Sequence, residues 1–241
     1  MSDTKPMLSV ILPAFNEKNN LLLLIPKIIE VISKRYVDYE VVLVDDGSND
    51  GTREAIYGLR ERFPKVKYIG FKQNRGLSTA LAAGYEISQG EIIVTMDSDL
   101  QYDPQDIPRL VEKLDVCELV CGFRRSRHDR FFKKVSSKIA NNIRRAIIKD
   151  AVNDSGCIFR AFRRGSCEDI KLFRGFHRFL PALFKSKGFK VVEIDVKHFP
   201  RKYGRSKYNV RNRLFVTFID LLMLKWFEAR KIDYEISEKI L

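Results

Sequence analysis

Short apolar runs alternate with stretches of helical apolar spacing along the first hundred residues. Uninterrupted apolar or β-branched residues predict buried strands, and apolar residues at every third or fourth position predict amphipathic helices. The predicted strands are Leu8–Leu12, Glu40–Val44, Val66–Phe71 and Glu91–Met96, and the predicted helices are Leu21–Ile32, a helix ending near Arg62, and Leu77–Ile87. This alternation indicates a mostly parallel sheet with helices on both faces.

The pattern continues after residue 100 with shorter elements. We expect a helix over Asp106–Leu114, a strand over Glu118–Cys121, a strand-like run ending at Phe162, a helix over His177–Lys187 and an alternating strand over Lys190–Lys197. Between them Val135, Ile139, Ile143 and Ile147 recur every four residues, which predicts one apolar stripe on a helix. The length of 241 residues suits one large domain with an appendage.

The segment Leu214–Phe227 differs from the rest because it is apolar nearly all round. As a helix it would extend about 21 Å, short of the roughly 30 Å of a bilayer core. Two interpretations stay open: a helix that lies in a membrane interface or docks a partner, and a core helix packed on the sheet. At the other end Leu8–Leu12 runs directly into Pro13 and predicts a strand, so a signal peptide is not expected.

Positive charge is concentrated in two segments. The net charge is +13, but Cys121–Arg145 holds nine Lys or Arg against one Asp, and Lys197–Arg213 holds seven with no acid. Such segments suit nucleic acid, an anionic membrane or a phosphorylated substrate. The four cysteines lack metal-ligand spacing, so free thiols in a reducing compartment are expected.

The candidate chemistry lies where two predicted strands end. Asp97 and Asp99 follow one strand, with the amide oxygen of Gln101 two residues further, and Asp45 and Asp46 end another. Ligands bind at the carboxyl ends of parallel strands, and hard oxygen ligands favour Mg²⁺ or Mn²⁺. A solvated turn is the alternative for such residues. No G-x-G-x-x-G follows the first strand, which disfavours a hydride-transfer enzyme.

Several motifs then occur in one order: PAFNE, VDDGSNDGT, NRGLSTALAAG, MDSDLQYDP, NDSGC and RKYGRSKYN. This ordered set resembles glycosyltransferase family 2, in its dolichol-phosphate mannose synthase-like (polyprenyl-phosphate glycosyltransferase) branch, over roughly Leu8 to Trp226. The resemblance implies a GT-A (Rossmann-like) α/β catalytic domain over residues 1–210. Residues 211–241 would then be an apolar helix and tail for a membrane interface or a partner.

The resemblance also implies a role for each matching residue. Asp97, Asp99 and Gln101 would hold Mg²⁺ or Mn²⁺, with Asp97, Asp99 and Arg124 as the catalytic residues. Arg124, Lys133 and Ser137 would bind the acceptor phosphate. The nucleotide-sugar donor would contact Pro13, Phe15, Asn16, Glu17, Asp45, Asp46, Gly76, Asp97, Ser98, Arg201, Ser206 and Lys207. Tyr102 and Asp103 depart from the family's usual motif, and the extra acid could shift the metal geometry.

The acceptor is inferred from an absent base. Transfer to a hydroxyl needs a general base, and the region where relatives carry one reads HRFLPAL here. A phosphate monoester arrives ionised and needs cations instead, which the basic segment supplies. The alternatives are a family 2 transferase acting on a polysaccharide or lipopolysaccharide hydroxyl, with His177 or Asp154 as base, and a basic binding module for nucleic acid or anionic lipid without catalysis.

We therefore expect an inverting, metal-dependent hexosyltransferase. Its donor would be GDP-mannose or a UDP-sugar, and its acceptor dolichyl or undecaprenyl phosphate. The expected location is the cytoplasmic membrane face, reached through the tail, the basic surface or a separate membrane subunit. No nucleic-acid partner is expected.

Overall fold

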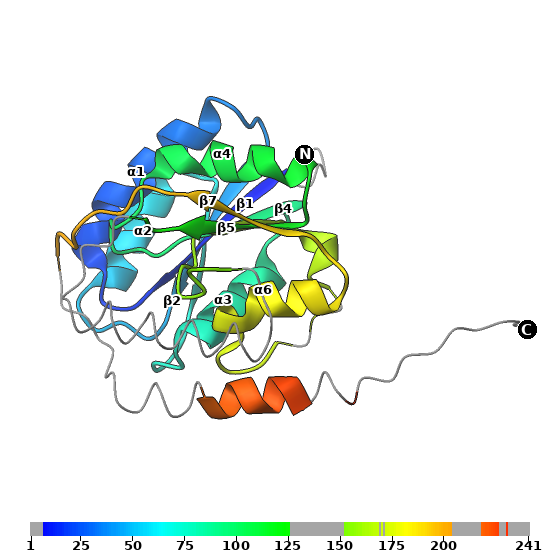
Figure 1. Cartoon of the computed structure of the whole chain (residues 1–241). Helices are drawn as coiled ribbons and strands as arrows, with labels where there is room; N and C mark the ends of the chain where they lie inside the picture. The colour runs from blue at the N-terminus through cyan, green and yellow to red at the C-terminus, as the bar shows by residue number, and fades with distance from the viewer. Residues whose placement is uncertain are drawn as a thin grey trace, which may run out of the picture.

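The described residues of the computed structural model, 7–125, 152–168, 170, 172–203, 218–226 and 230, contain one seven-stranded sheet. Its strand order is β3-β2-β1-β4-β6-β5-β7. Only β6 runs antiparallel to its neighbours, β4 and β5. Figure 1 shows the sheet between two layers of helices. The prediction of a mostly parallel sheet is confirmed.

The elements lie close to their predicted ranges. The strands are β1 (Leu8–Ala14), β2 (Tyr39–Asp45), β3 (Val66–Gly70), β4 (Ile92–Thr95), β5 (Leu119–Phe123), β6 (Arg160–Arg163) and β7 (Val191–Asp195). The helices are α1 (Lys18–Ser33), α2 (Thr52–Arg62), α3 (Leu77–Ile87), α4 (Ile107–Glu112) and α6 (Phe176–Ser186), with 3₁₀ turns η1 (Pro104–Asp106), η2 (Lys113–Asp115) and η3 (Arg164–Ser166). Pro26 lies inside α1 rather than at its first turn.

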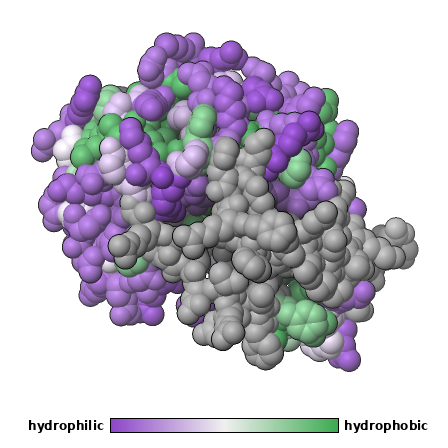
Figure 2. All heavy atoms as spheres, turned by 60° about the vertical axis from the view of Figure 1, so that its left-hand side comes forward, coloured by the Kyte–Doolittle hydropathy of each residue, from purple (hydrophilic) through white to green (hydrophobic). Residues whose placement is uncertain are grey.

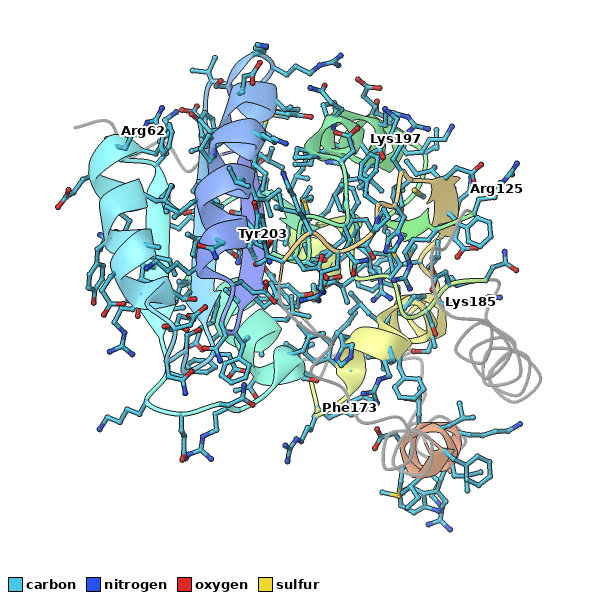
Figure 3. The ribbon with its side chains drawn as sticks, turned by 90° about the vertical axis from the view of Figure 1, so that its left-hand side faces the viewer. Arg62, Arg125, Phe173, Lys185, Lys197 and Tyr203 are labelled. Carbon is cyan, nitrogen blue, oxygen red and sulfur yellow. The ribbon has the colours of Figure 1, made fainter. Side chains whose placement is uncertain are left out.

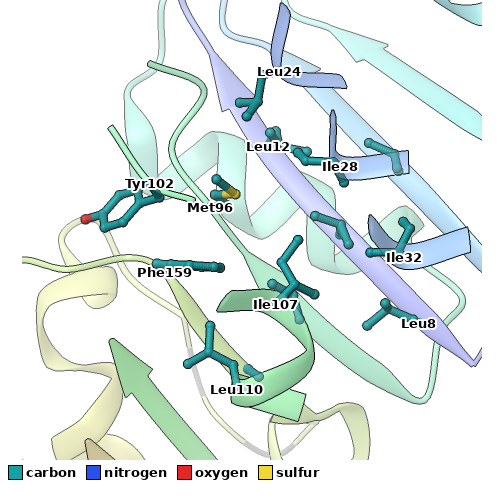
Figure 4. Packing of buried hydrophobic residues seen from close by; sticks show 14 of the residues in the cluster. Leu8, Leu12, Leu24, Ile28, Ile32, Met96, Tyr102, Ile107, Leu110 and Phe159 are labelled. Carbon is teal, nitrogen blue, oxygen red and sulfur yellow. The ribbon is translucent and has the colours of Figure 1, made fainter. Parts of the chain in front are cut away.

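Helices cover both faces of the sheet, as predicted. The apolar sides of α1, α2 and α4 pack in one core cluster and those of α3 and α6 in another. Figure 4 shows the first cluster, in which Leu24, Ile28 and Ile32 of α1 lie over Leu8 and Leu12 of β1. The central strands β1, β2 and β4 are apolar on both faces and are buried between the two helical layers.

The arrangement collects several loops at one edge of the sheet. Since β1, β2, β4 and β5 share one direction, residues 15–17, 46–51 and 96–104 and Arg124 all follow strand ends at that edge. This is where open α/β sheets bind ligands.

Residues 196–203, which we call the strap, return from β7 to this edge. The Lys197 N–H donates to Asp106 Oδ2 (2.8 Å), and the Phe199 N–H donates to the Gln101 carbonyl oxygen (2.8 Å). Figure 3 places Lys197 near α4 and Tyr203 near α1, in agreement with the hollow that the strap and α1 line together. The strap thus carries its basic residues across the loop that follows β4.

Residues 218–226 are helical and have two unlike apolar sides. Leu221 and Leu224 are buried against Phe179 and Ala182 of α6. The other side leaves five large apolar residues exposed: Phe218, Ile219, Leu222, Met223 and Trp226. Figure 2 shows apolar atoms at the lower edge of the molecule, apart from the apolar patches near its top. This helix therefore packs on α6 and also presents an apolar face to solvent. The predicted stripe of Val135 to Ile147 lies outside the described residues.

Candidate functional site

The loop after β1 is tied to the loop after β2. Asn16 has a left-handed backbone (φ 54°), and its N–H donates to Ser48 Oγ (2.8 Å) while its Oδ1 accepts from the Asn49 N–H (2.8 Å). The Glu17 N–H donates to Thr52 Oγ1 (3.0 Å). A left-handed non-glycine residue persists where its surroundings hold it, and such residues concentrate at functional sites. Asn16 and Glu17 are thereby fixed at the sheet edge.

Asp45 and Asp46 have different surroundings although they are adjacent. Asp45 is fully buried at the end of β2, and its Oδ1 accepts from the Ser48 N–H (2.9 Å). Asp46 accepts from the N–H groups of Arg75 (2.6 Å) and Gly76 (2.9 Å) and from Asn74 Nδ2 (2.9 Å). Burial raises the pKa of Asp46, and the two backbone N–H groups oppose this. Asp46 therefore shapes the turn that contains Gly76 (φ 90°).

The loop after β4 carries the central acidic pair. Ser98 lies between Asp97 and Asp99, and its hydroxyl donates to the Pro13 carbonyl oxygen (2.7 Å), which joins this loop to the end of β1. Leu100 is left-handed (φ 61°). The Asp99 Oδ1 accepts from the Gln101 N–H (3.2 Å). The loop after β4 is thus held directly to the end of β1.

Arg201 of the strap joins both loops. Its Nη2 lies 2.6 Å from Asp99 Oδ2, and its Nη1 lies 3.1 Å from Glu17 Oε1. Glu17 and Asp99 are buried, so the contact is an enclosed, charge-assisted one. Glu17, Asp99 and Arg201, which are up to 184 positions apart in the sequence, are thus brought together in the structure.

The acidic pair has unusual protonation properties. Burial raises the pKa of Asp97 to about 7; the charge of Asp99 adds to this, and Arg124 and Arg201 oppose it. Burial also raises the pKa of Asp99, opposed by Arg201. Two carboxylates held close together in a crowded site favour a bound cation, because a cation relieves their mutual repulsion.

Arg124 follows β5 and forms a closed pair with Asp154. Arg124 Nε lies 2.6 Å from Asp154 Oδ2, and Arg124 Nη2 lies 2.8 Å from Asp154 Oδ1. Both side chains are almost fully enclosed. The charge of Arg124 acts on Asp97, but two of the Arg124 donors are already engaged by the Asp154 carboxylate.

Two hollows flank this edge. One, of about 450 Å³, lies next to Asp45 and is lined by Arg53, Tyr57, Tyr68, Gly70, Phe71 and Lys72. The other, of about 580 Å³, lies between α1, the loop after β4 and the strap, and is lined by Leu23, Leu24, Lys27, Leu100, Tyr102, Asp103, Pro104, Phe199, Pro200, Arg201 and Lys202. Both combine aromatic or apolar walls with cationic side chains.

The structure places most of the predicted site residues at one edge. They lie at the ends of β1 and β2 or in the loops described above: Pro13, Phe15, Asn16, Glu17, Asp45, Asp46, Gly76, Asp97, Ser98, Asp99, Gln101, Arg124 and Arg201. Lys133, Ser137, Ser206 and Lys207 lie outside the described residues. Sequence reasoning considered Asp154 only as an alternative base and missed Glu193, which holds the backbone before β6. Asp154 belongs to the NDSGC motif, but no spacing rule links it to Arg124 or Glu193.

The residues present fit a hard divalent cation that is shared with a phosphate ligand. Within the described ranges, no three His, Cys, Asp or Glu side chains form a complete metal site. Asp97 and Asp99 nevertheless provide two carboxylates, and the Gln101 amide nitrogen donates to the Phe199 carbonyl oxygen (3.1 Å), so its oxygen is the side-chain atom left to act as a ligand. Mg²⁺-type sites commonly use one or two carboxylates and complete their shell with substrate phosphates and water.

The sheet order, the helical layers and the acidic loop after β4 together define a GT-A fold. Solved structures agree: glucosyl-3-phosphoglycerate synthase from Mycobacterium tuberculosis matches with a TM-score of 0.68 at 18% identity over 95% of this chain and 80% of that one. The mannosyltransferase PcManGT from Pyrobaculum calidifontis matches with a TM-score of 0.65 at 22% identity over 97% of this chain and 67% of that one.

The family follows from the sequence comparisons. The family model of glycosyl transferase family 2 matches residues 9–171, and the chain belongs to this family. It is 33% identical to the undecaprenyl-phosphate 4-deoxy-4-formamido-L-arabinose transferase of Aeromonas hydrophila over 85% of this chain and 63% of that protein. It is 34% identical to the dodecaprenyl-phosphate galacturonate synthase of Rhizobium johnstonii over 93% of this chain and 68% of that protein. The chain thus spans a little under two thirds of the arabinose transferase.

Proposed function

We propose that this chain transfers a hexose-type sugar from a nucleotide diphosphate to a polyprenyl phosphate. The observation that carries the proposal is the convergence of Asp97, Asp99, Arg201 and Arg124 at the carboxyl edge of a family 2 sheet. Two carboxylates suit a metal–diphosphate, and the guanidinium groups suit phosphate oxygens. The two relatives are an undecaprenyl-phosphate sugar transferase and a dodecaprenyl-phosphate galacturonate synthase, and they support the same reaction class.

The donor half of the site consists of the loops after β1, β2 and β4. Asp97, Asp99 and the Gln101 oxygen would hold Mg²⁺ or Mn²⁺; both solved structures named above were determined in complex with Mn²⁺. Such an ion neutralises charge that develops on the leaving diphosphate. Asn16, Glu17, Asp45 and the turn at Gly76 would border the nucleotide, with Pro13, Phe15, Asp46 and Ser98 shaping these loops. Arg201 stands close enough to Asp99 to move onto the diphosphate.

The acceptor half centres on Arg124, with Lys133 and Ser137 expected nearby. A phosphate monoester attacks in its ionised form, so the reaction requires cations that orient it and no proton acceptor. Attack from the side opposite the leaving diphosphate would invert the anomeric carbon. An assay has to distinguish GDP-mannose from a UDP-sugar as the donor. It also has to distinguish dolichyl from undecaprenyl phosphate as the acceptor.

The test is a transfer assay with purified chain, Mn²⁺ or Mg²⁺, a panel of labelled GDP- and UDP-sugars and a short polyprenyl phosphate. We expect label to enter the organic phase with one donor, and to be lost with EDTA or in the Asp99→Asn variant. Labelled sugar on a hydroxyl acceptor instead would replace this proposal with the polysaccharide or lipopolysaccharide alternative. Absence of donor binding would contradict both.

We also propose that residues 211–241 form a tail that holds the catalytic domain, residues 1–210, at the cytoplasmic membrane face, directly or through a separate membrane subunit. The exposed apolar face of residues 218–226 supports this, because contiguous apolar surface of this kind marks interaction sites. Arg230 lies over the Trp226 ring at 4.9 Å, a pairing that suits an interface rich in anionic groups. Among the described residues, no helix is long and apolar enough to cross a membrane.

A further inference from the structure

The ion pair of Arg124 and Asp154 is far less exposed to solvent than the neighbouring ion pair at the same edge of the sheet. The two side chains are 10% and 5% exposed, and two parallel hydrogen bonds join them. The adjacent pair, Arg125 and Asp195, has a single contact of 3.1 Å, and its side chains are 76% and 49% exposed. Bidentate geometry fixes the plane of a guanidinium, whereas a single exposed contact does not.

Asp154 is itself held from a neighbouring strand. Glu193 of β7 accepts from the Asn153 N–H (2.8 Å), from Asn153 Nδ2 (2.8 Å) and from the Asp154 N–H (3.0 Å). Glu193 is paired in register with Cys121 of β5, the strand that Arg124 follows. Arg124 is therefore held from both sides: by its own strand, and by a carboxylate whose backbone is anchored to the next strand.

The donors of Arg124 divide into two groups. Nε and Nη2 are used by Asp154, while Nη1 has no hydrogen-bond partner among the described residues. A guanidinium has five N–H donors in a rigid fork, so clamping one edge aims the remaining nitrogen in a fixed direction. A lysine at this position could not be clamped and directed in the same way.

We infer that Asp154 is a positioning residue that orients Arg124 toward the acceptor phosphate, and that it is not the general base of the reaction. This inference rests on the proposed function. A carboxylate whose two oxygens each accept from one guanidinium is poorly placed to take a proton from a nucleophile. In this role Asp154 acts on the acceptor through Arg124, whose guanidinium it holds.

The test is steady-state kinetics of Asp154→Asn with farnesyl phosphate as the acceptor. Asparagine keeps the shape of the side chain but turns one of its two acceptor atoms into a donor facing the guanidinium. We expect the KM for farnesyl phosphate to rise about 10- to 100-fold, which corresponds to the loss of one good charge-assisted contact. The kcat should stay within about threefold, the pH–rate profile should keep its shape, and donor-nucleotide affinity should stay within about twofold. Asp195→Asn, which opens the exposed neighbouring pair, is the matched control and should behave as the unaltered chain.

A fall in kcat of about 10²- to 10⁴-fold with loss of the acidic limb of the pH–rate profile would show a general base and overturn the inference. An unchanged KM would overturn it as well. If Asp154→Asn does not fold, Glu193→Gln loosens the same clamp and should raise the KM in the same direction by a smaller factor.

A second readout separates this inference from the proposed function. The Arg124 Nε–H signal in ¹H–¹⁵N spectra, assigned by its loss in Arg124→Lys, should exchange slowly in the unaltered chain and be lost or fast in Asp154→Asn. Titration with farnesyl phosphate should shift this signal in the unaltered chain. If no sugar is transferred but the phosphate still shifts a clamped Arg124, the proposed function fails and the clamp stands. If the Nε–H exchanges fast in the unaltered chain, the clamp itself is wrong.

Discussion

Asp97 and Asp99 leave β4 one residue apart, yet each carboxylate meets a different part of the molecule. Asp99 is in contact with Arg201 of the strap, whereas Asp97 lies within the field of Arg124. Burial within the protein raises the pKa of both carboxyl groups. The two carboxylates suit a bound cation, but they destabilise the folded chain while they are ionised and no cation is bound. Such conflicts between stability and function are common at functional sites.

This conflict predicts how Asp97 affects stability. Folding raises its pKa from about 3.9 to about 7, so the folded chain binds this proton more tightly than the unfolded chain does. The resulting stabilisation is complete below about pH 4 and is lost as the pH rises through about 7. Relative to the unaltered chain, Asp97→Asn should therefore gain unfolding free energy, on the order of 1 kcal/mol per pH unit, as the pH rises from about 4 to about 7.

Urea unfolding in EDTA at pH 5, 6, 7 and 8 measures this difference. Adding Mn²⁺ at pH 8 should stabilise the unaltered chain and leave the variant unchanged. Asp195→Asn, a change of an exposed carboxylate, controls for the alteration in net charge. A difference between the Asp97→Asn variant and the unaltered chain that stays constant across the pH range would contradict the assignment.

Helix α3 shows how an element is fitted to the sheet beneath it. A Cβ atom on Gly84 would lie 2.4 Å from Ile11 Cγ2 and 3.3 Å from Val44 Cγ2, so glycine allows α3 to approach β1 and β2 closely. The same helix begins at Gly76, in the turn that Asp46 holds. The spacing of apolar residues predicted α3 at its observed bounds, but a glycine inside a helical pattern does not by itself reveal a close approach. That fact depends on which strand lies below it.

Gly84→Ala should therefore destabilise the fold. Overpacking of a fitted core typically costs about 1 to 3 kcal/mol, more than the gain from a better helix former. Gly58→Ala in α2 is the matched control, since a Cβ atom there meets nothing within 4 Å, and it should stabilise by up to about 1 kcal/mol. Thermal melts of both variants against the unaltered chain measure the contrast. Equal melting shifts would show that α3 does not pack on β1 as described.

Periodicity along the whole chain predicted the class of sheet and the edge at which the site lies. It worked because β1, β2 and β4 are apolar on both faces and end in polar loops. It could not predict that β6 runs antiparallel, since pairing direction leaves no mark on a four-residue strand. Contacts across long separations were equally out of reach: Arg201 meets Glu17, and Asp154 meets Arg124, only because the strap and β6 return to the same edge. Family resemblance supplied Arg201 and Arg124, and geometry supplied their partners.

In the proposed function, the helix at residues 218–226 is the part of the chain that faces the membrane. One side is used against α6, so the exposed side is held in a fixed orientation relative to the catalytic sheet. Leu222 and Trp226 are each about half exposed, and moving such a side chain out of water contributes on the order of 1 kcal/mol or more.

Leu222→Ser and Trp226→Ser should each weaken co-sedimentation with anionic phospholipid vesicles about five- to tenfold. Val116→Ser, which alters an equally exposed apolar residue elsewhere, should not. Transfer to soluble farnesyl phosphate should survive in both tail variants, because the change removes the membrane contact and not the site. Vesicle binding that is unaffected by both tail variants would assign the exposed face to a protein partner instead.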